Sequence, residues 1–357
     1  MSTANTNKES IAHIYKQIPT SHYLNDDHQG TYYTGDYKIG LNFFSFAYNL
    51  ESWFTDVQEG GARIDTLQAI RFAKEAGFDT VDITAYYLPG YERFKMPSKS
   101  DEEIFGYARK VKNLCDELGI IISGTGVKND FAVPSQESRA LDVEHVKYWI
   151  DVAAVMGAPV MRVFSGLVPE DIESSDWETI ARDRIVPALR ECASYGAQKG
   201  VKIGVQNHGD MMATADQVIR ILKWVDHPNL GVVNDTGYFR PFQSSNGVGY
   251  DWYDDIEAIL PYTVNFQIKR KPAGYYTDTL MDLEQLFIRI RRIPYRGYLP
   301  FEMIWENEEA EHPRNLSEPP YKQISDFLAL VKSAAEITKS RGTSSIDPFP
   351  ATKREIP

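Results

Sequence analysis

Short apolar runs alternate with longer amphipathic segments along almost all of this 357-residue chain. The runs have the length of buried strands. The segments between them repeat apolar residues with the period of a helix, as Val218, Ile221 and Val225 do. Gly77 and Gly157 stand where such helices should end. The predicted strands are residues 38–46, 80–85, 119–125, 160–165, 201–207, 230–236, 264–269 and 298–304.

Eight strand–helix units in series predict an α/β fold, namely a (β/α)8 TIM barrel of parallel strands. A doubly wound open sheet would show the same alternation, but eight units of this length favour closure into a barrel. We expect an N-terminal arm over residues 1–37, the barrel over 38–340 and an extended tail over 341–357, which is rich in Pro and Ser.

Four oxygen-bearing side chains stand at the ends of the last four predicted strands: Gln206, Asp235, Gln267 and Glu302. In a parallel barrel these positions converge on the mouth where active sites lie. Two carboxylates and two amides form an oxygen-rich set of the kind that hard divalent cations prefer. We therefore predict a metal site here, with Mn²⁺ or Mg²⁺ as the ion. Taken singly, each of the four could instead be a loop cap or an ion-pair partner.

His208 and Lys269 each lie two residues beyond a predicted ligand, so they share its face of the strand. We predict that they act in catalysis together with Glu302. His208 could alternatively cap the next helix, and Lys269 heads a basic run that could be solvated.

Three residues near other strand ends are candidates for substrate binding. Arg162 could bind a substrate oxygen or pair with an inner carboxylate such as Asp82. Tyr87 lies in an aromatic segment that could pack on the C–H surface of a sugar. Lys128 follows the third strand and could reach the substrate from its loop.

Composition narrows the classes of partner and location. The net charge of −12 disfavours nucleic acid and anionic membranes as partners. Two cysteines, Cys115 and Cys192, are too few for a disulfide framework and are expected as buried thiols. The polar start MSTANTNKES and the lack of an 18-residue apolar run predict a cytoplasmic protein without a membrane span.

Five segments carry a resemblance to a known family: DTVDITAYYLPGY, VQNHGD, VNDTGYF, FQIK and PFEM. In this order and spacing they resemble the xylose isomerase-like TIM barrels, over roughly residues 38–340. That family includes sugar isomerases, sugar 3-epimerases, inosose dehydratases and endonuclease IV. The resemblance implies one divalent metal held by Glu, Asp, His and Glu from strands five to eight, and a proton carried on and off carbon by the two glutamates.

This chain departs from the family pattern at two of the four positions. Asp235 and Glu302 match, but Gln206 stands where the first Glu is expected and Gln267 where the His is expected. The all-oxygen set shifts the preference from zinc towards magnesium, manganese or calcium. Because a glutamine cannot take up a proton, one base of the pair is lost, and His208 or Lys269 could replace it.

Three functions remain open at this stage. The favoured one is a sugar or keto-sugar isomerase or epimerase that uses a divalent metal. A lyase or dehydratase acting on an oxidised sugar needs only one base and one acid. A non-catalytic sugar-binding barrel without metal is the third. The expected partner is a small-molecule sugar, and the N-terminal arm and the segment ENEEAEHP suggest contacts in a homo-oligomer.

Overall fold

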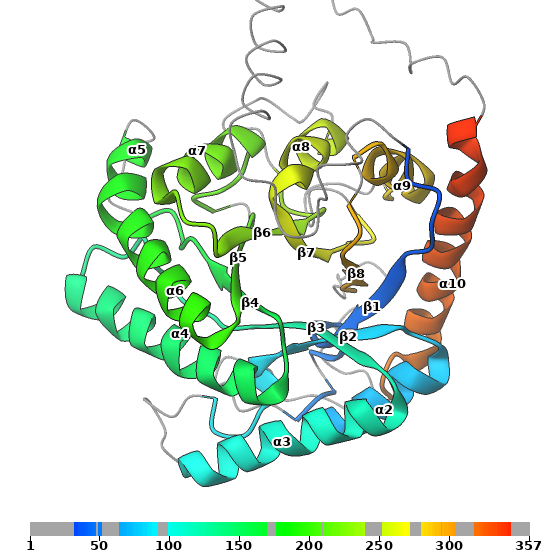
Figure 1. The fold of residues 1–357 in the computed structure, drawn as a ribbon, viewed down its shortest axis with the longest axis horizontal. Coiled ribbons are helices and arrows are strands. Elements are labelled where there is room, and N and C mark those ends of the chain that lie inside the picture. The colour runs from blue at the N-terminus through cyan, green and yellow to red at the C-terminus, as the bar shows by residue number, and fades with distance from the viewer. Residues whose placement is uncertain are drawn as a thin grey trace, which may run out of the picture.

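The strands form one parallel sheet that closes into a barrel, and helices surround it (Figure 1). The sheet order is β7-β6-β5-β4-β3-β2-β1-β8, and a parallel bridge between Ile268 and Phe301 joins its two ends. The backbone N–H of Ile268 donates to Pro300 O (3.0 Å) and that of Glu302 to Ile268 O (2.9 Å). The computed structural model describes residues 32–47, 49–51, 64–91, 99–169, 176–208, 210–239, 252–271, 280–293, 295–303 and 318–343.

All eight predicted strands are present, and the prediction of a (β/α)8 barrel is confirmed. Each observed strand lies within or next to its predicted range. The strands are β1 Lys38–Asn42, β2 Thr80–Thr84, β3 Ile121–Gly126, β4 Val160–Phe164, β5 Lys202–Gln206, β6 Leu230–Asp235, β7 Thr263–Gln267 and β8 Tyr298–Phe301.

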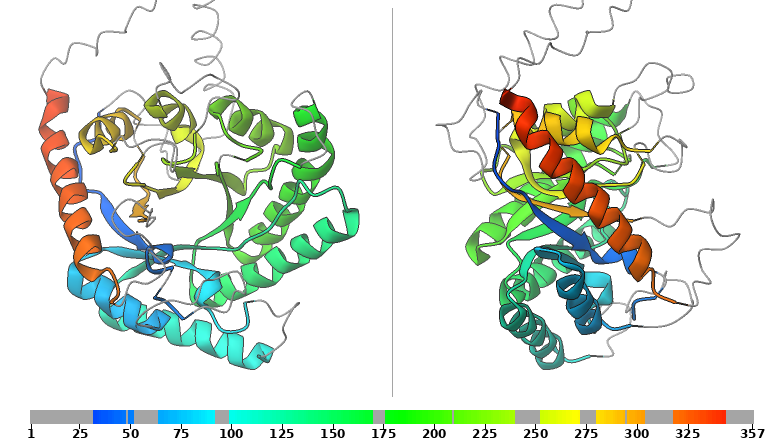
Figure 2. Two further views of the ribbon diagram at one scale, coloured as in Figure 1. Left: turned by 180° about the vertical axis from the view of Figure 1, so that it is seen from behind. Right: turned by 90° about the vertical axis from the view of Figure 1, so that its right-hand side faces the viewer.

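Helices cover the outside of the barrel in every view (Figure 2). Helices α2 (Thr66–Ala76) and α4 (Gln136–Met156) end at glycines, as predicted: Gly77 and Gly157 both cap in the left-handed region, with φ of 89° and 82°. None of the described helices combines the length and apolar character needed to cross a membrane. The helices are α2 Thr66–Ala76, α3 Asp101–Leu118, α4 Gln136–Met156, α5 Trp177–Ile180, α6 Val186–Lys199, α7 Ala215–Val225, α8 Trp252–Ile259, α9 Leu283–Arg292 and α10 Tyr321–Ile337.

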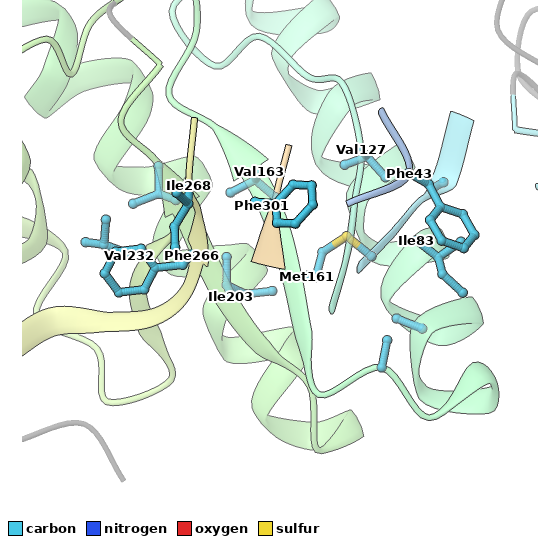
Figure 3. Close-up of a cluster of buried hydrophobic side chains, with 14 of the residues drawn as sticks. Phe43, Ile83, Val127, Met161, Val163, Ile203, Val232, Phe266, Ile268 and Phe301 are labelled. Carbon is cyan, nitrogen blue, oxygen red and sulfur yellow. The ribbon is translucent and has the colours of Figure 1, made fainter. Parts of the chain in front are cut away.

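The two faces of each strand differ in polarity. The outward side chains, such as Met161, Val163 and Ile203, form the main apolar core (Figure 3). Val160 and Val233 alternate with these and form a separate small cluster with Val264. Because Val160 and Val233 precede the polar interior residues by two positions, the valines lie beneath those residues in the barrel. The mouth above them is free to carry polar groups.

Several predicted strand boundaries differ from the structure: β7 ends at Gln267 and β8 at Phe301, both earlier than predicted. Two other differences have a clear local reason. Residues 43–46 form a 3-10 helix, η2 Phe43–Phe46, because the Asn42 side chain accepts from the backbone N–H of Phe44 (2.8 Å) and turns the chain. The third strand begins at Ile121, two residues late, because Gly119 takes a left-handed φ of 61° to end α3. Most of the predicted arm and tail lies outside the described residues.

Candidate functional site

The ends of β5, β6 and β7 meet through a buried amide–carboxylate cluster. The Nε2 group of Gln206 donates to Asp235 Oδ2 (2.5 Å) and to Gln267 Oε1 (2.7 Å). All three side chains are buried, and Asp235 Oδ1 accepts from the backbone N–H of Gly237 (2.9 Å). The predicted convergence of these positions is therefore confirmed by the geometry.

Lys269 brings a positive charge into this cluster. Its ammonium group contacts Glu302 Oε1 and lies 3.3 Å from Asp235 Oδ2. The Lys269 side chain is only 4% exposed, so the ammonium is desolvated and the two carboxylates replace its water. Burial raises the pKa of the Asp235 carboxyl, and the neighbouring ammonium acts in the opposite direction. Strand parity predicted that Lys269 points inward, and it does.

His208 lies at the rim of the same mouth. Its Nδ1 atom is 3.0 Å from Asp210 Oδ2, which orients the ring. The ring stacks on Tyr238 with 4.1 Å between centroids and meets Phe164 edge-on at 4.7 Å. The side chain is 33% exposed, so His208 is positioned by its neighbours yet reachable from outside.

Arg162 lies inside the barrel on β4. Its two terminal guanidinium nitrogens donate to the Tyr86 hydroxyl (3.4 and 3.3 Å), and one of them also donates to Val127 O. A Cβ atom at Gly126 would lie 2.6 Å from Arg162 Nε, so a glycine there makes room for the guanidinium. The Nε atom is buried without a hydrogen-bond partner among the described residues. Of the five guanidinium N–H groups, three donate, so Nε–H and one hydrogen of a terminal nitrogen are left.

Arg162 donates to Tyr86 and Val127 and not to Asp82, so the predicted pairing of Arg162 with Asp82 is not a direct contact. The Asp82 carboxylate accepts from the amides of Asn42 (3.0 Å) and Asn265 (2.7 Å). Burial raises the pKa of Asp82 to about 6, and the positive charge of Arg162 partly opposes this through space.

The other two substrate-binding candidates lie apart from the cluster. Tyr87 is buried in η3 Ala85–Tyr87, after β2, and its carbonyl oxygen accepts from the Thr66 hydroxyl (2.9 Å). Lys128 is exposed, and its backbone N–H donates to the Tyr91 hydroxyl (2.7 Å). No contact joins either of them to the Gln206–Asp235–Lys269 cluster within the described parts of the chain. Their roles stay predictions.

Sequence reasoning gave no role to three residues that shape the mouth. Phe164 packs against both His208 and the Arg162 guanidinium, whose carbon lies 4.2 Å from the ring centroid. Tyr238 stacks on His208, and Asp210 orients it. The signal was present, because Phe164 ends β4, Asp210 follows His208 by two residues and Tyr238 closes the NDTGY turn.

The four predicted metal ligands meet, but as they lie they do not fit a divalent cation. Gln206 turns its NH₂ group, not its oxygen, towards Asp235 and Gln267; the flipped amide would set oxygen against oxygen. The Lys269 ammonium already holds both carboxylates. Among the described residues, no three His, Cys, Asp or Glu side chains group as a metal site. Gln206 Oε1 is buried and has no hydrogen-bond partner in the described parts of the chain, which leaves one neutral acceptor for a ligand.

Solved structures of similar fold include several sugar epimerases. The 3-keto-D-glucoside 4-epimerase YcjR from E. coli is 16% identical over 84% of this chain and 100% of its own, with a TM-score of 0.60. L-ribulose 3-epimerase is 16% identical over 88% and 100%, with a TM-score of 0.62. The IolI protein with a bound zinc atom is 16% identical over 87% and 100%, with a TM-score of 0.59. Such identities show a common fold.

No curated protein matches the sequence. The model of the xylose isomerase-like TIM barrel family matches residues 70–329, which span most of the barrel from α2 to α10. The closed eight-stranded sheet and the polar cluster at the ends of β5 to β8 agree with that match. The chain belongs to the xylose isomerase-like TIM barrel family.

Proposed function

We propose that this protein is a sugar or keto-sugar isomerase or epimerase, which moves a proton on and off a carbon next to a carbonyl group. The observation that carries the proposal is the buried cluster of Glu302, Lys269 and Asp235 at the barrel mouth, with amides of Gln206 and Gln267 beside it. The likeness in fold to two sugar epimerases supports the choice of substrate class.

The two carboxylates have different surroundings, which gives them different roles. Asp235 is fully buried, accepts from Gln206 and Gly237 and has the Lys269 ammonium 3.3 Å from its Oδ2, so it orients the cluster. Glu302 is 6% exposed and accepts from Lys269 alone among the described side chains. Glu302 is therefore the base that takes the proton from carbon.

Other residues bind the sugar and handle the second proton. The unpaired Oε1 of Gln206 and Nε of Arg162 are an acceptor and a donor that sugar hydroxyl groups would satisfy. His208 is the general acid, because Asp210 orients its ring and Nε2 has no partner among the described residues. Arrangements of this kind contribute about 10²–10⁴-fold to the rate.

A lyase or dehydratase is the second candidate. Gln206 cannot accept a proton, so Glu302 is the carboxylate among the described residues that this proposal uses as the base. Elimination needs one base and one acid, and Glu302 and His208 would supply them. The product would be lighter than the substrate, whereas isomerisation and epimerisation conserve mass.

The test is incorporation of solvent deuterium into a panel of ketohexoses, ketopentoses and 3-keto-glucosides, followed by NMR and mass spectrometry. We expect exchange at the carbon next to the carbonyl, with mass otherwise conserved. The variant Glu302→Gln should slow exchange by about 10²–10⁴-fold. Glu117→Gln, at an exposed position of α3, should leave it unchanged. A lighter product identifies the lyase, and tight sugar binding without exchange identifies a non-catalytic barrel. The cytoplasmic location and the homo-oligomer stay predictions.

A further inference from the structure

Both the backbone and the charged group of Lys269 make contacts that position this residue in the site. Its backbone N–H donates to the Thr236 hydroxyl (2.8 Å), at the end of the neighbouring strand β6. The side chain then runs inward to place its ammonium between Asp235 and Glu302. The ammonium also lies 5.3 Å from the centroid of the Tyr238 ring, within range of a cation–π contact.

A glycine opposite Lys269 gives its stem the space it needs. A Cβ atom at Gly237 would lie 2.5 Å from Lys269 Cγ and 3.0 Å from Lys269 Cβ. Any side chain at position 237 would therefore displace the Lys269 side chain. The Asp235 carboxylate accepts from the backbone N–H of the same Gly237. The turn at Gly237 therefore binds the Asp235 carboxylate and also leaves space for the Lys269 side chain.

The charges show which cation this cluster suits. Asp235 and Glu302 supply two negative charges and Lys269 one positive charge, while Gln206 and Gln267 are neutral. One net negative charge remains. Three carboxylates around a divalent ion would leave the same net charge. The lysine with its two carboxylates therefore reaches the same balance with one positive charge and two negative ones. A divalent ion entering here would need the same two carboxylates and would be repelled by the ammonium.

We propose that the Lys269 ammonium is the resident cation of this site and stands in place of a divalent metal. The inference rests on the proposed function for its chemical role. When Glu302 removes the proton, the C–H electron pair forms a carbon–carbon double bond and the carbonyl π pair moves onto oxygen. The Lys269 N–H donates a hydrogen bond to that oxygen and stabilises its negative charge. Return of the proton to carbon reverses both shifts, so no other reactant is consumed.

The first experiment measures metal, not turnover. Wild-type protein purified without chelator is analysed for bound metals and titrated with Mn²⁺ alone by calorimetry. We expect no stoichiometric metal and no site with a Kd below about 0.1 mM. The variant Lys269→Met should gain one Mn²⁺ per chain, bound at least about tenfold more tightly than by wild type, because the competing charge is gone. Lys223→Met, at an exposed position of α7, should behave as wild type.

A wild-type protein that holds one divalent ion per chain, or binds Mn²⁺ as tightly as Lys269→Met does, overturns the inference. If Lys269→Met fails to fold, the wild-type measurements decide by themselves. These readouts need no substrate, so they stand even if no sugar exchanges and the proposed function fails. Where a sugar does exchange, EDTA should leave the wild-type rate unchanged, and inhibition by EDTA that added Mn²⁺ reverses would contradict the inference.

Discussion

Two buried aspartates inside this barrel are held in different ways. Asp82 on β2 accepts from the neutral amides of Asn42 and Asn265. Asp235 on β6 has an ammonium group 3.3 Å away, and that group also contacts Glu302. Burial raises the pKa of both carboxyls.

A polar barrel interior is therefore not in itself a site. Neutral amides satisfy the hydrogen bonds of Asp82, and the positive charge of Arg162 is directed to Tyr86 and Val127 instead. Such an arrangement joins β2 to β1 and β7 across the barrel interior. In the second half a cation joins two carboxylates, one of them at the mouth, so that charge can be redistributed when a substrate binds.

The strongest test of the comparison removes the cation. Lys269→Met should lower the free energy of unfolding by about 3–5 kcal/mol, because two buried carboxylates lose their partner. Urea unfolding at neutral pH measures the change. The double variant Lys269→Met/Glu302→Gln, which removes one charge of each sign, should recover part of the loss. A single variant as stable as wild type would show that the ammonium does not hold this half together.

The second test uses pH on the other aspartate. The folded-state pKa of Asp82, about 6, exceeds its ordinary value of 3.8, so its contribution to stability is present below about pH 4 and is lost as the pH rises through 6. Asp82→Asn removes this dependence. Relative to wild type, the variant should gain about 2 kcal/mol of unfolding free energy between pH 4.5 and pH 7.

Urea unfolding of both proteins at the two pH values measures that gain. Asp183→Asn, at an exposed position, serves as the control and should follow wild type. Parallel pH profiles of Asp82→Asn and wild type would mean that Asp82 is ionised in the fold at little cost. The amides of Asn42 and Asn265 would then suffice for a buried charge.

Much of the fold and the meeting of the site residues could be predicted, because both follow from periodicity. Alternation gave the eight strands, and strand parity placed Gln206, Gln267 and Lys269 on the inner face. What Lys269 contacts could not be predicted. The choice between solvent and the Asp235–Glu302 pair depends on the space that Gly237 leaves, which is a property of two strands side by side.

Strand boundaries and residues near the barrel mouth were harder to predict, because they too depend on contacts that a periodic pattern does not reveal. The run that continues past Asn42 is apolar enough to be a strand, but the Asn42 side chain turns it into η2. The loop that carries Lys128 is held by a hydrogen bond from the Lys128 backbone N–H to the Tyr91 hydroxyl, and the predicted role of the exposed Lys128 stays a prediction. The turn at Asn42 and this loop contact each depend on one hydrogen bond made by a side chain, which leaves no periodic trace in a sequence.

A smaller loss of unfolding free energy is expected when a side chain at position 237 crowds the methylene groups of Lys269. Gly237→Ala places a methyl group 2.5 Å from Lys269 Cγ, so we expect a loss of about 1–2 kcal/mol in urea unfolding. Gly106→Ala, inside α3 where the nearest atom lies 3.9 Å away, should instead stabilise by up to about 1 kcal/mol. Equal responses of the two variants would mean that Gly237 is not needed to place the lysine.

The smallest change in stability is expected at the rim, where His208 and Asp210 are 33% and 22% exposed. Asp210→Asn should alter the free energy of unfolding by less than about 1 kcal/mol, because water screens the pair. It should also slow deuterium exchange less than His208→Gln does, since the asparagine oxygen can still accept from Nδ1–H and keep the ring oriented. An equal loss of rate in both variants would show that the charge of Asp210, and not its hold on the ring, is what His208 requires. The cation of Lys269 would then not be the only charge on which the mouth depends.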